Sequence, residues 1–146
     1  MILKAAKSCD LEQILQLQKE NFANKTINRN ELEQELQNEN YHTIVVESDG
    51  MIVGVGTVLT VAEFATVTNI ATKHKRQGIG TAILLELLSF CKKNGATQID
   101  LEVRKSNSAA INLYEKHGFS EVFRRKNYYK KPTEDAIIMQ KLICGK

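Results

Sequence analysis

Two glycines at the beginning of a long helical pattern are the residues best suited to bind a ligand. The chain passes from an apolar stretch through Lys73 and Arg76 into Gly78-Ile79-Gly80, where the helical pattern begins. The first N–H groups of a helix have no partner within it and lie at the positive end of its dipole, so they bind anions. A glycine also lets a ligand approach the backbone without meeting a Cβ. The spacing therefore predicts a pyrophosphate site over residues 76–81.

This glycine pattern departs from the two common nucleotide motifs. A dinucleotide motif needs a third glycine where Ile83 stands, although Asp100 has the spacing of the acidic residue that binds ribose. A P-loop needs a lysine before its hydroxyl residue, whereas Gly80 is followed directly by Thr81. Two such glycines can also do no more than shape a strand-to-helix turn, so other segments must decide the function.

Length and composition are typical of one soluble domain over residues 1–146, with 42% apolar and 25% charged residues. No run approaches 18 apolar residues, and the early polar residues do not fit a secretory signal, so we expect neither a membrane segment nor export. Cys9, Cys91 and Cys144 are widely spaced, which predicts reduced thiols in a cytoplasmic protein with no metal site. The net charge of +3 suits an anionic ligand without requiring nucleic acid.

Hydrophobic periodicity predicts the elements that position the glycines. A strand over 64–71, a helix over 79–94 and a strand over 99–104 form one parallel crossover, which should be right-handed. Further strands are expected at 2–5, 43–47, 51–59, 119–125 and 135–142, and a short helix at 107–117. Together these elements predict a mixed α/β sheet flanked by helices.

Local signals mark the other helix starts and one turn. Asp10, with Gln13 reaching back to it, should cap a first helix, and Asn28 with Glu31 should cap a second. Asp49-Gly50 predicts a two-residue hairpin turn.

The glycine segment and two later segments together resemble the GNAT superfamily of N-acetyltransferases. They read Arg-Gln-Gly-Ile-Gly-Thr over Arg76–Thr81, Leu-Glu-Val-Arg over Leu101–Arg104, and a Leu-Tyr-Glu core within Ser106–Phe119. The tail segments Arg124–Tyr129 and Glu134–Met139 extend the resemblance to the RimI branch, the bacterial ribosomal-protein-alanine N-acetyltransferases. The resemblance covers residues 69–142, about half of the chain.

The resemblance implies the GNAT fold, an acyl-CoA N-acyltransferase domain whose mixed sheet splays apart to admit acetyl-CoA, with no metal. It assigns the acetyl and pantetheine amides to the backbone of Ile70, Ala71 and Thr72, and the pantetheine arm also to Asn107. It assigns the pyrophosphate to Arg76, Gln77, Gly78, Ile79, Gly80 and Thr81.

The resemblance also implies the catalytic groups, with Glu102 as the proton acceptor, Tyr114 as the proton donor, and Tyr128 and Tyr129 beside the acceptor peptide. An amine attacks a thioester only when neutral, and the departing thiolate is helped by an acid. Tyrosine, with a reference pKa near 10, is protonated at neutral pH and can donate. The implied reaction acetylates an N-terminal alanine, by resemblance that of a small-subunit ribosomal protein.

The residue pattern alone leaves simpler interpretations open. Glu102 alternates with apolar neighbours and could face solvent, and Tyr114 could be a half-buried packing residue. Asn107 could be only a helix cap. The basic segment 124–131, with five cations around two tyrosines, could contact RNA or be a solvated strand end, although direct nucleic-acid binding is not our preferred interpretation.

The acceptor is the less certain half of the reaction. At pH 7 an α-amine is roughly 14% neutral and a lysine about 0.04%, so one glutamate suits a protein N-terminus best. RimI-like chains carry a Phe-Pro-Trp-Ser-type segment where this chain reads Phe-Ala-Asn-Lys-Thr over 22–26, which leaves peptide specificity open. The alternatives are acetylation of a small amine or lysine, a non-catalytic acyl-CoA-binding domain, and an RNA- or ribosome-binding module.

Overall fold

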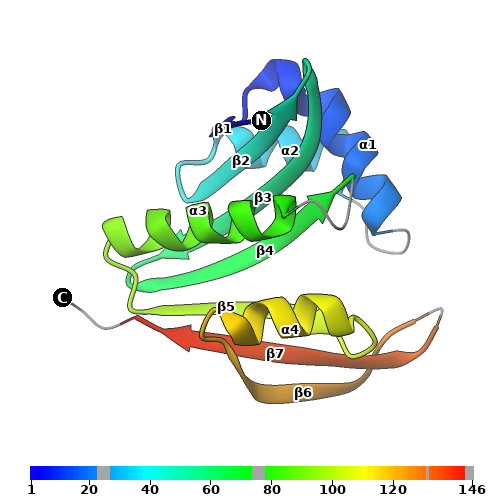
Figure 1. Ribbon diagram of the computed structural model, residues 1–146, viewed down its shortest axis with the longest axis vertical. Coiled ribbons are helices and arrows are strands. Elements are labelled where there is room, and N and C mark those ends of the chain that lie inside the picture. Colours follow the sequence, from blue (N-terminus) through cyan, green and yellow to red (C-terminus); the bar gives the residue numbers. More distant parts are fainter. Residues whose placement is uncertain (23–26, 74–77, 131, 144–146) are drawn as a thin grey trace.

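A mixed sheet with helices on both faces organises the chain (Figure 1). The computed structural model describes residues 1–22, 27–73, 78–130 and 132–143, which include seven strands in the order β1-β2-β3-β4-β5-β7-β6. The strands are β1 (Ile2–Ala5), β2 (Tyr41–Ser48), β3 (Met51–Val61), β4 (Phe64–Thr72), β5 (Gln98–Arg104), β6 (Ser120–Tyr129) and β7 (Glu134–Leu142). The helices are α1 (Leu11–Asn21), α2 (Arg29–Gln37), α3 (Ile79–Lys93) and α4 (Ser108–Lys116). The predicted mixed α/β class is confirmed.

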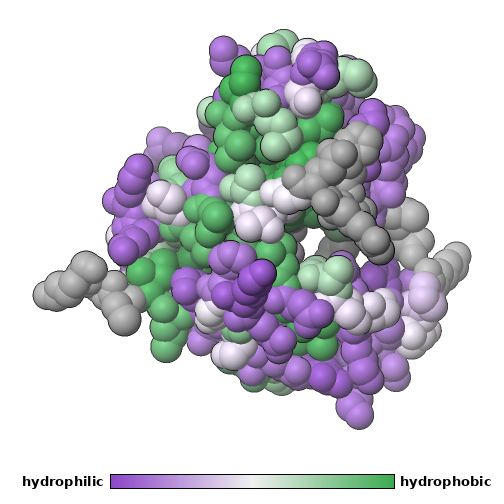
Figure 2. All heavy atoms as spheres, viewed as in Figure 1, coloured by the Kyte–Doolittle hydropathy of each residue, from purple (hydrophilic) through white to green (hydrophobic). Residues whose placement is uncertain are grey.

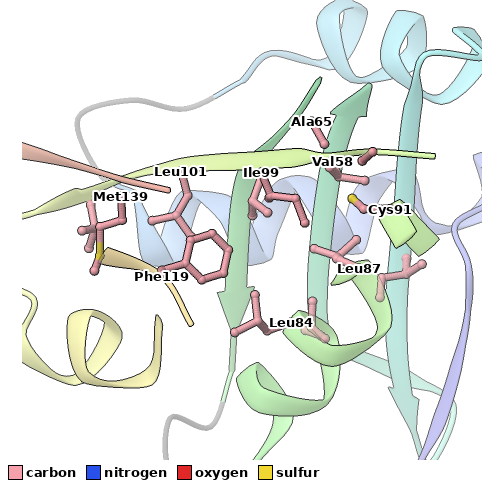
Figure 3. Packing of buried hydrophobic residues seen from close by; sticks show 14 of the residues in the cluster. Val58, Ala65, Leu84, Leu87, Cys91, Ile99, Leu101, Phe119 and Met139 are labelled. Atoms are coloured by element: carbon pink, nitrogen blue, oxygen red, sulfur yellow. The ribbon is translucent and has the colours of Figure 1, made fainter. Parts of the chain in front are cut away.

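Two apolar clusters lie on the two faces of this sheet. Successive side chains of a strand point to opposite faces, so the neighbours Val45 and Val46 of β2 belong to different clusters. The larger cluster packs α3 and α4 against the sheet, and Figure 3 shows Leu84 and Leu87 of α3 in it beside Ile99 of β5. The smaller cluster packs α1 and α2 on the other face.

Helix α3 lies close to β3 because two glycines of that strand leave room for it. A Cβ added to Gly56 would lie 2.3 Å from Cγ2 of Ile83, and one added to Gly54 would lie 2.7 Å from Cγ2 of Ile79. Both isoleucines belong to the predicted apolar face of α3 and are buried. The bare backbone of β3 thus sets how deeply the glycine-bearing start of α3 sits on the sheet.

The predicted parallel crossover and two of the local signals are confirmed. β4 and β5 pair in parallel, with α3 between them in sequence. The Asn28 side chain accepts a hydrogen bond from Glu31 N, and Glu31 accepts one from Asn28 N, which is the expected capping box. Asp49 and Gly50 both have positive φ, 53° and 77°, as the hairpin turn requires.

Asp10 is the N-cap residue of α1 as predicted, but the side-chain contacts predicted for Asp10 and Gln13 are wrong. A 3-10 turn over Ser8–Asp10 precedes α1, and the Asp10 side chain makes no cap hydrogen bond to the helix but accepts from Lys7 N at 3.0 Å. Gln13 turns instead to the sheet, where its Oε1 accepts from Ile52 N at 2.8 Å. A strand backbone that is distant in sequence competes successfully for this side chain.

The strand predicted over 119–125 is longer than expected. β6 extends to Tyr129, which pairs with Glu134 of β7. Two register shifts let β6 follow β7 over this length. As a consequence, most of the basic segment and both tyrosines lie on a strand rather than in the connection.

Candidate active site

β4 and β5 separate halfway along their length. Their parallel pairing begins at Phe64 and Gln98 and includes Val67 and Leu101, after which no further partners join the two strands. β4 nevertheless continues to Thr72 and β5 to Arg104. Figure 2 shows the molecule hollowed between the part that carries β4 and the part that carries β5. The expected splay of the sheet is therefore present, and it opens at the ends of the strands nearest the start of α3.

The backbone of β4 faces this opening at alternate residues. Lys73 N donates to Val53 O at 2.9 Å, which makes these two residues a hydrogen-bonded pair of the β3–β4 ladder. Because such pairs alternate with non-bonded ones, Ala71 also turns its N–H and C=O toward β3. Ile70 and Thr72 turn theirs the other way, into the opening. Of the three backbones expected to bind donor amides, two are directed there.

An amide group already occupies one of these positions. Asn21, at the end of α1, donates from Nδ2 to Thr72 O at 3.1 Å, and its Oδ1 accepts from Thr72 N at 3.4 Å. Gln18, one turn earlier, donates to Oδ1 of Asn69 at 3.3 Å. The open edge of β4 thus binds a carboxamide as a neighbouring strand would. The backbone of Thr72 at this edge therefore accepts an amide as its hydrogen-bond partner.

The start of α3 has the open backbone that an anion needs. Gly78 is the N-cap with φ of 73°, and among the described residues no atom beyond its chain neighbours lies within 4 Å of a Cβ added to it. Gly80 has only Thr72 and Leu113 at 4.0 Å from such a Cβ. Ile79 is fully buried in the core, while Thr81 in the first turn is partly exposed. Arg76 and Gln77 lie outside the described residues.

Glu102 lies on the face of β5 opposite the core. Leu101 and Val103 are buried in the larger cluster, while Glu102 between them is partly exposed, on the same face as Asp100 and Arg104. Its negative charge acts on Tyr129 and, after burial, is the second cause that raises the pKa of that phenol to about 12. The simple solvent-facing interpretation is incomplete, because Glu102 is half-buried near an aromatic hydroxyl of another strand.

Tyr114 lies on the face of the sheet opposite Glu102. It belongs to α4 and packs partly buried against the larger cluster, with its ring edge-to-face on Phe119 at 5.9 Å between centroids. Burial raises the pKa of Tyr114 above its ordinary value. The phenol therefore keeps its proton over the whole physiological range and is chemically fit to donate one.

The acceptor-side tyrosines and Asn107 have different surroundings. Tyr128 is 41% exposed, and its ring meets that of Tyr129 edge-to-face at 5.3 Å. Arg104 lies 4.0 Å from the Tyr129 centroid. The Asn107 side chain accepts from Ala110 N at 3.2 Å, so it is the helix cap that the simpler interpretation predicted. Its exposed position also leaves it accessible to a ligand.

Three residues near this site, Asn21, Arg104 and Glu134, were assigned no role from the sequence. Asn21 touches β4 through a contact between residues 51 apart in sequence, and Arg104 meets Glu134 across 30. Both contacts depend on the tertiary arrangement of strands. Only the Leu-Glu-Val-Arg and Glu-Asp segments, which contain Arg104 and Glu134, could have drawn attention to two of them.

The described residues also bear on metal binding and on membrane insertion. No group of three or more His, Cys, Asp or Glu side chains in these residues is arranged to hold a metal ion. None of their helices has the length and apolar character needed to cross a bilayer.

The fold and site define a class of known enzymes. The acetyltransferase (GNAT) domain model matches residues 5–133. The chain therefore belongs to the GNAT acetyltransferase family, whose members use acetyl-CoA, and it is an N-acetyltransferase.

Several relatives of this chain are ribosomal protein bS18-alanine N-acetyltransferases. The ribosomal protein bS18-alanine N-acetyltransferase of Escherichia coli is 42% identical over 109 residues, covering 70% of this chain and 72% of that protein. The enzyme of that name from Haemophilus influenzae is 35% identical over 147 residues, covering 94% and 96%. The crystal structure of the Escherichia coli enzyme superposes with a TM-score of 0.88 at 32% identity, covering 97% of this chain and 93% of that one.

Proposed function

We propose that this N-acetyltransferase transfers the acetyl group of acetyl-CoA to the α-amine of an N-terminal alanine, on a small-subunit ribosomal protein. Glu102 is the base and Tyr114 the acid. The observation that supports the proposal is the separation of β4 and β5 after Val67 and Leu101, with Glu102 and Tyr114 on opposite faces of the sheet. The names of the relatives support the choice of acceptor.

The reaction follows from these positions. The acceptor nitrogen attacks the thioester carbon, the new C–N bond forms, and the C–S bond breaks. Glu102 takes the proton that the nitrogen loses, directly or through water, and Tyr114 gives a proton to the departing thiolate. Each proton transfer of this kind contributes about 10²- to 10⁴-fold in rate. Direct attack requires no covalent enzyme intermediate.

The donor arm is held along β4 and the start of α3. In this proposal the pantetheine amides bind Ile70 and Thr72, where Asn21 now contacts the strand edge. Ala71 contributes its small buried side chain instead. The pyrophosphate binds the first N–H groups of α3 from Gly78 to Thr81, with Arg76 and Gln77 before them. Asn107, the N-cap residue of α4, contacts the arm from the side of β5.

The acceptor approaches from the face of Glu102. Tyr128 and Tyr129 border that face from β6, and their hydroxyls can bind the first peptide groups of an acceptor. An N-terminal amine is a suitable nucleophile here because roughly 14% of it is already neutral at pH 7, against about 0.04% of a lysine. One partly buried glutamate is then sufficient as base.

A peptide panel tests the proposal. Acetyl transfer from acetyl-CoA is measured on peptides that differ only in their first residue, beside blocked lysine peptides and free polyamines. We expect the alanine peptide with the N-terminal sequence of the cognate ribosomal protein to have the highest kcat/KM. Transfer confined to polyamines or lysine would contradict the acceptor, and CoA binding without any transfer would contradict the enzymatic proposal.

A further inference from the structure

An ion pair joins the segment after the catalytic strand to the hairpin that carries the two tyrosines. Arg104, at the end of β5, contacts Oε2 of Glu134, at the start of β7, through Nη1 at 2.9 Å. The other oxygen of Glu134 accepts from Ser106 N at 2.9 Å. Both side chains are largely covered, with 29% and 15% exposed. A pair with both carboxylate oxygens engaged is geometrically defined, unlike a mobile surface pair.

The same arginine holds Tyr129. Its guanidinium carbon lies 4.0 Å from the centre of the Tyr129 ring, and Tyr129 is paired with Glu134 across the β6–β7 hairpin. Arg104 is therefore fixed from two sides, by a carboxylate and by an aromatic face. A planar guanidinium suits both contacts at once, and an ammonium does not.

These contacts join every element that carries a catalytic or acceptor-side group. Glu102 precedes Arg104 by two residues and lies on the same face of β5. Ser106 directly precedes Asn107, the cap of the helix that carries Tyr114. A backbone bond from Lys105 N to Asp135 O at 3.1 Å runs beside the ion pair.

We propose that Arg104 and Glu134 are positioning residues for the acceptor, holding the Tyr129 ring beside Glu102 on the acceptor face of the opening. This inference rests on the proposed function, because it assumes that Tyr129 borders the bound acceptor. The contacts of this pair described above are with Ser106 and Tyr129, on the acceptor side of the opening, rather than with β4. Its loss should therefore weaken acceptor use and leave acetyl-CoA binding unchanged.

Charge adds a second role for Glu134. Before it loses its proton the acceptor amine is a cation, and an uncompensated guanidinium beside Glu102 would repel it. Glu134 neutralises Arg104, so the negative charge of Glu102 remains effective toward the amine. On this hairpin Arg124 pairs with Glu121 and Asp135, Arg125 lies 5.5 Å from the centroid of the Tyr128 ring, and Lys130 donates to Asn127 O. Removing the Glu134 charge alone should raise the acceptor KM more at a pH below the pKa of the amine than at a pH above it.

Steady-state kinetics of three variants test the proposal. Arg104→Met and Glu134→Gln are compared with Arg124→Met, which removes from the β6–β7 hairpin an arginine that pairs with Glu121 and Asp135. We expect the first two to raise the acceptor KM about tenfold, the size of one aromatic–cation contact. Their Kd for acetyl-CoA should stay within about twofold of wild type. Arg104→Lys, which preserves the charge, should recover only part of the loss.

The outcomes are distinguishable. If the wild type acetylates N-terminal peptides but Arg104→Met and Glu134→Gln match Arg124→Met in acceptor KM, the positioning role is overturned. An equal loss of acetyl-CoA affinity in both variants would also overturn it, because a general structural defect would then be responsible. If the wild type uses another amine, the proposed function fails, and the same KM comparison on that amine still decides the positioning role. A loss from Glu134→Gln that grows as the pH falls from 9 to 7 supports the charge argument.

Discussion

Val67 of β4 and Leu101 of β5 are the last residues that pair these two strands. Both side chains are buried in the larger cluster, so α3 and α4 hold the strands together up to this point. Beyond it the backbone edges of both strands are available to other partners. Glu102 is the next residue of β5, which places the candidate base at the start of the opening. The candidate site therefore lies where the pairing between β4 and β5 ends.

Replacing the candidate base should abolish most activity without affecting folding. We expect Glu102→Gln to lower kcat/KM for the acceptor by about 10²-fold, since the amine loses its proton acceptor. Asp100→Asn is the matched control on the same strand face, because the Asp100 carboxylate accepts hydrogen bonds from the side chains of Gln98 and Gln140. Steady-state kinetics and calorimetric acetyl-CoA binding measure both effects. Equal activity of the two variants would contradict the assignment.

The candidate acid can be tested with a variant that preserves packing. Tyr114→Phe retains the ring that meets Phe119 and removes only the hydroxyl. We expect kcat to fall about 10²-fold. Because burial raises the pKa of Tyr114, the wild type should lose this contribution only above pH 10. The pH–rate profile of Tyr114→Phe should lack that alkaline decline, and an unchanged kcat would exclude Tyr114 as the donor of the proton.

Substitutions at two glycines with similar φ should distinguish an effect on folding stability from an effect on acetyl-CoA binding. Gly78 and Gly50 have φ of 73° and 77°, and in the part of the chain that the structure describes only chain neighbours come within 4 Å of a Cβ added at either. Alanine at each should cost about 1 kcal/mol of folding free energy, through backbone strain alone. Only Gly78→Ala should also raise the Kd for acetyl-CoA, because only Gly78 begins α3. Denaturant unfolding and calorimetry measure the two effects, and equal Kd values would argue against a pyrophosphate at this turn.

The close approach of α3 to β3 predicts a steric coupling. Gly56→Ala places a Cβ 2.3 Å from Cγ2 of Ile83 and should destabilise the fold by about 1–3 kcal/mol. The cost should be smaller in an Ile83→Ala background, where the opposing methyl group is gone. A double-mutant cycle by urea unfolding measures this coupling. Additive effects would mean that α3 moves away from β3 at little cost.

Tyr129 predicts a stability change at alkaline pH. Burial, then the Glu102 charge, raises its pKa to about 12, whereas an unfolded tyrosine titrates near 10. The stabilisation from the neutral phenol is complete below pH 10 and is lost as the pH rises from 10 to 12. Tyr129→Phe should flatten this part of the stability profile, measured as urea midpoints from pH 9 to 11. Glu102→Gln should lower the phenol pKa in an ultraviolet titration, and no shift would place the two groups apart.

Local sequence patterns were sufficient for most of the elements. Periodicity predicted α3 and its buried face, and Asp49-Gly50 and Asn28 predicted a turn and a cap, since each depends on residues within a few positions. Asp10 is the N-cap of α1 as predicted, but the contact predicted for Gln13 was wrong because Ile52, distant in sequence, donates a hydrogen bond to it. Similarly, the pairing with β7 extends β6 to Tyr129.

The family, the β4–α3–β5 crossover and the glycines at the start of α3 were all predictable from the sequence. Each depends on motifs or periodicity within a short segment of the chain. Three features became visible only in the folded structure. They are the end of the β4–β5 pairing, the orientation of the Thr72 backbone toward the opening, and the contact of Arg104 with the Tyr129 ring. Each of these depends on strands that are distant in the chain and meet through pairing register and helix packing. Spacing along the sequence does not specify such contacts, because they form only when the whole sheet is assembled.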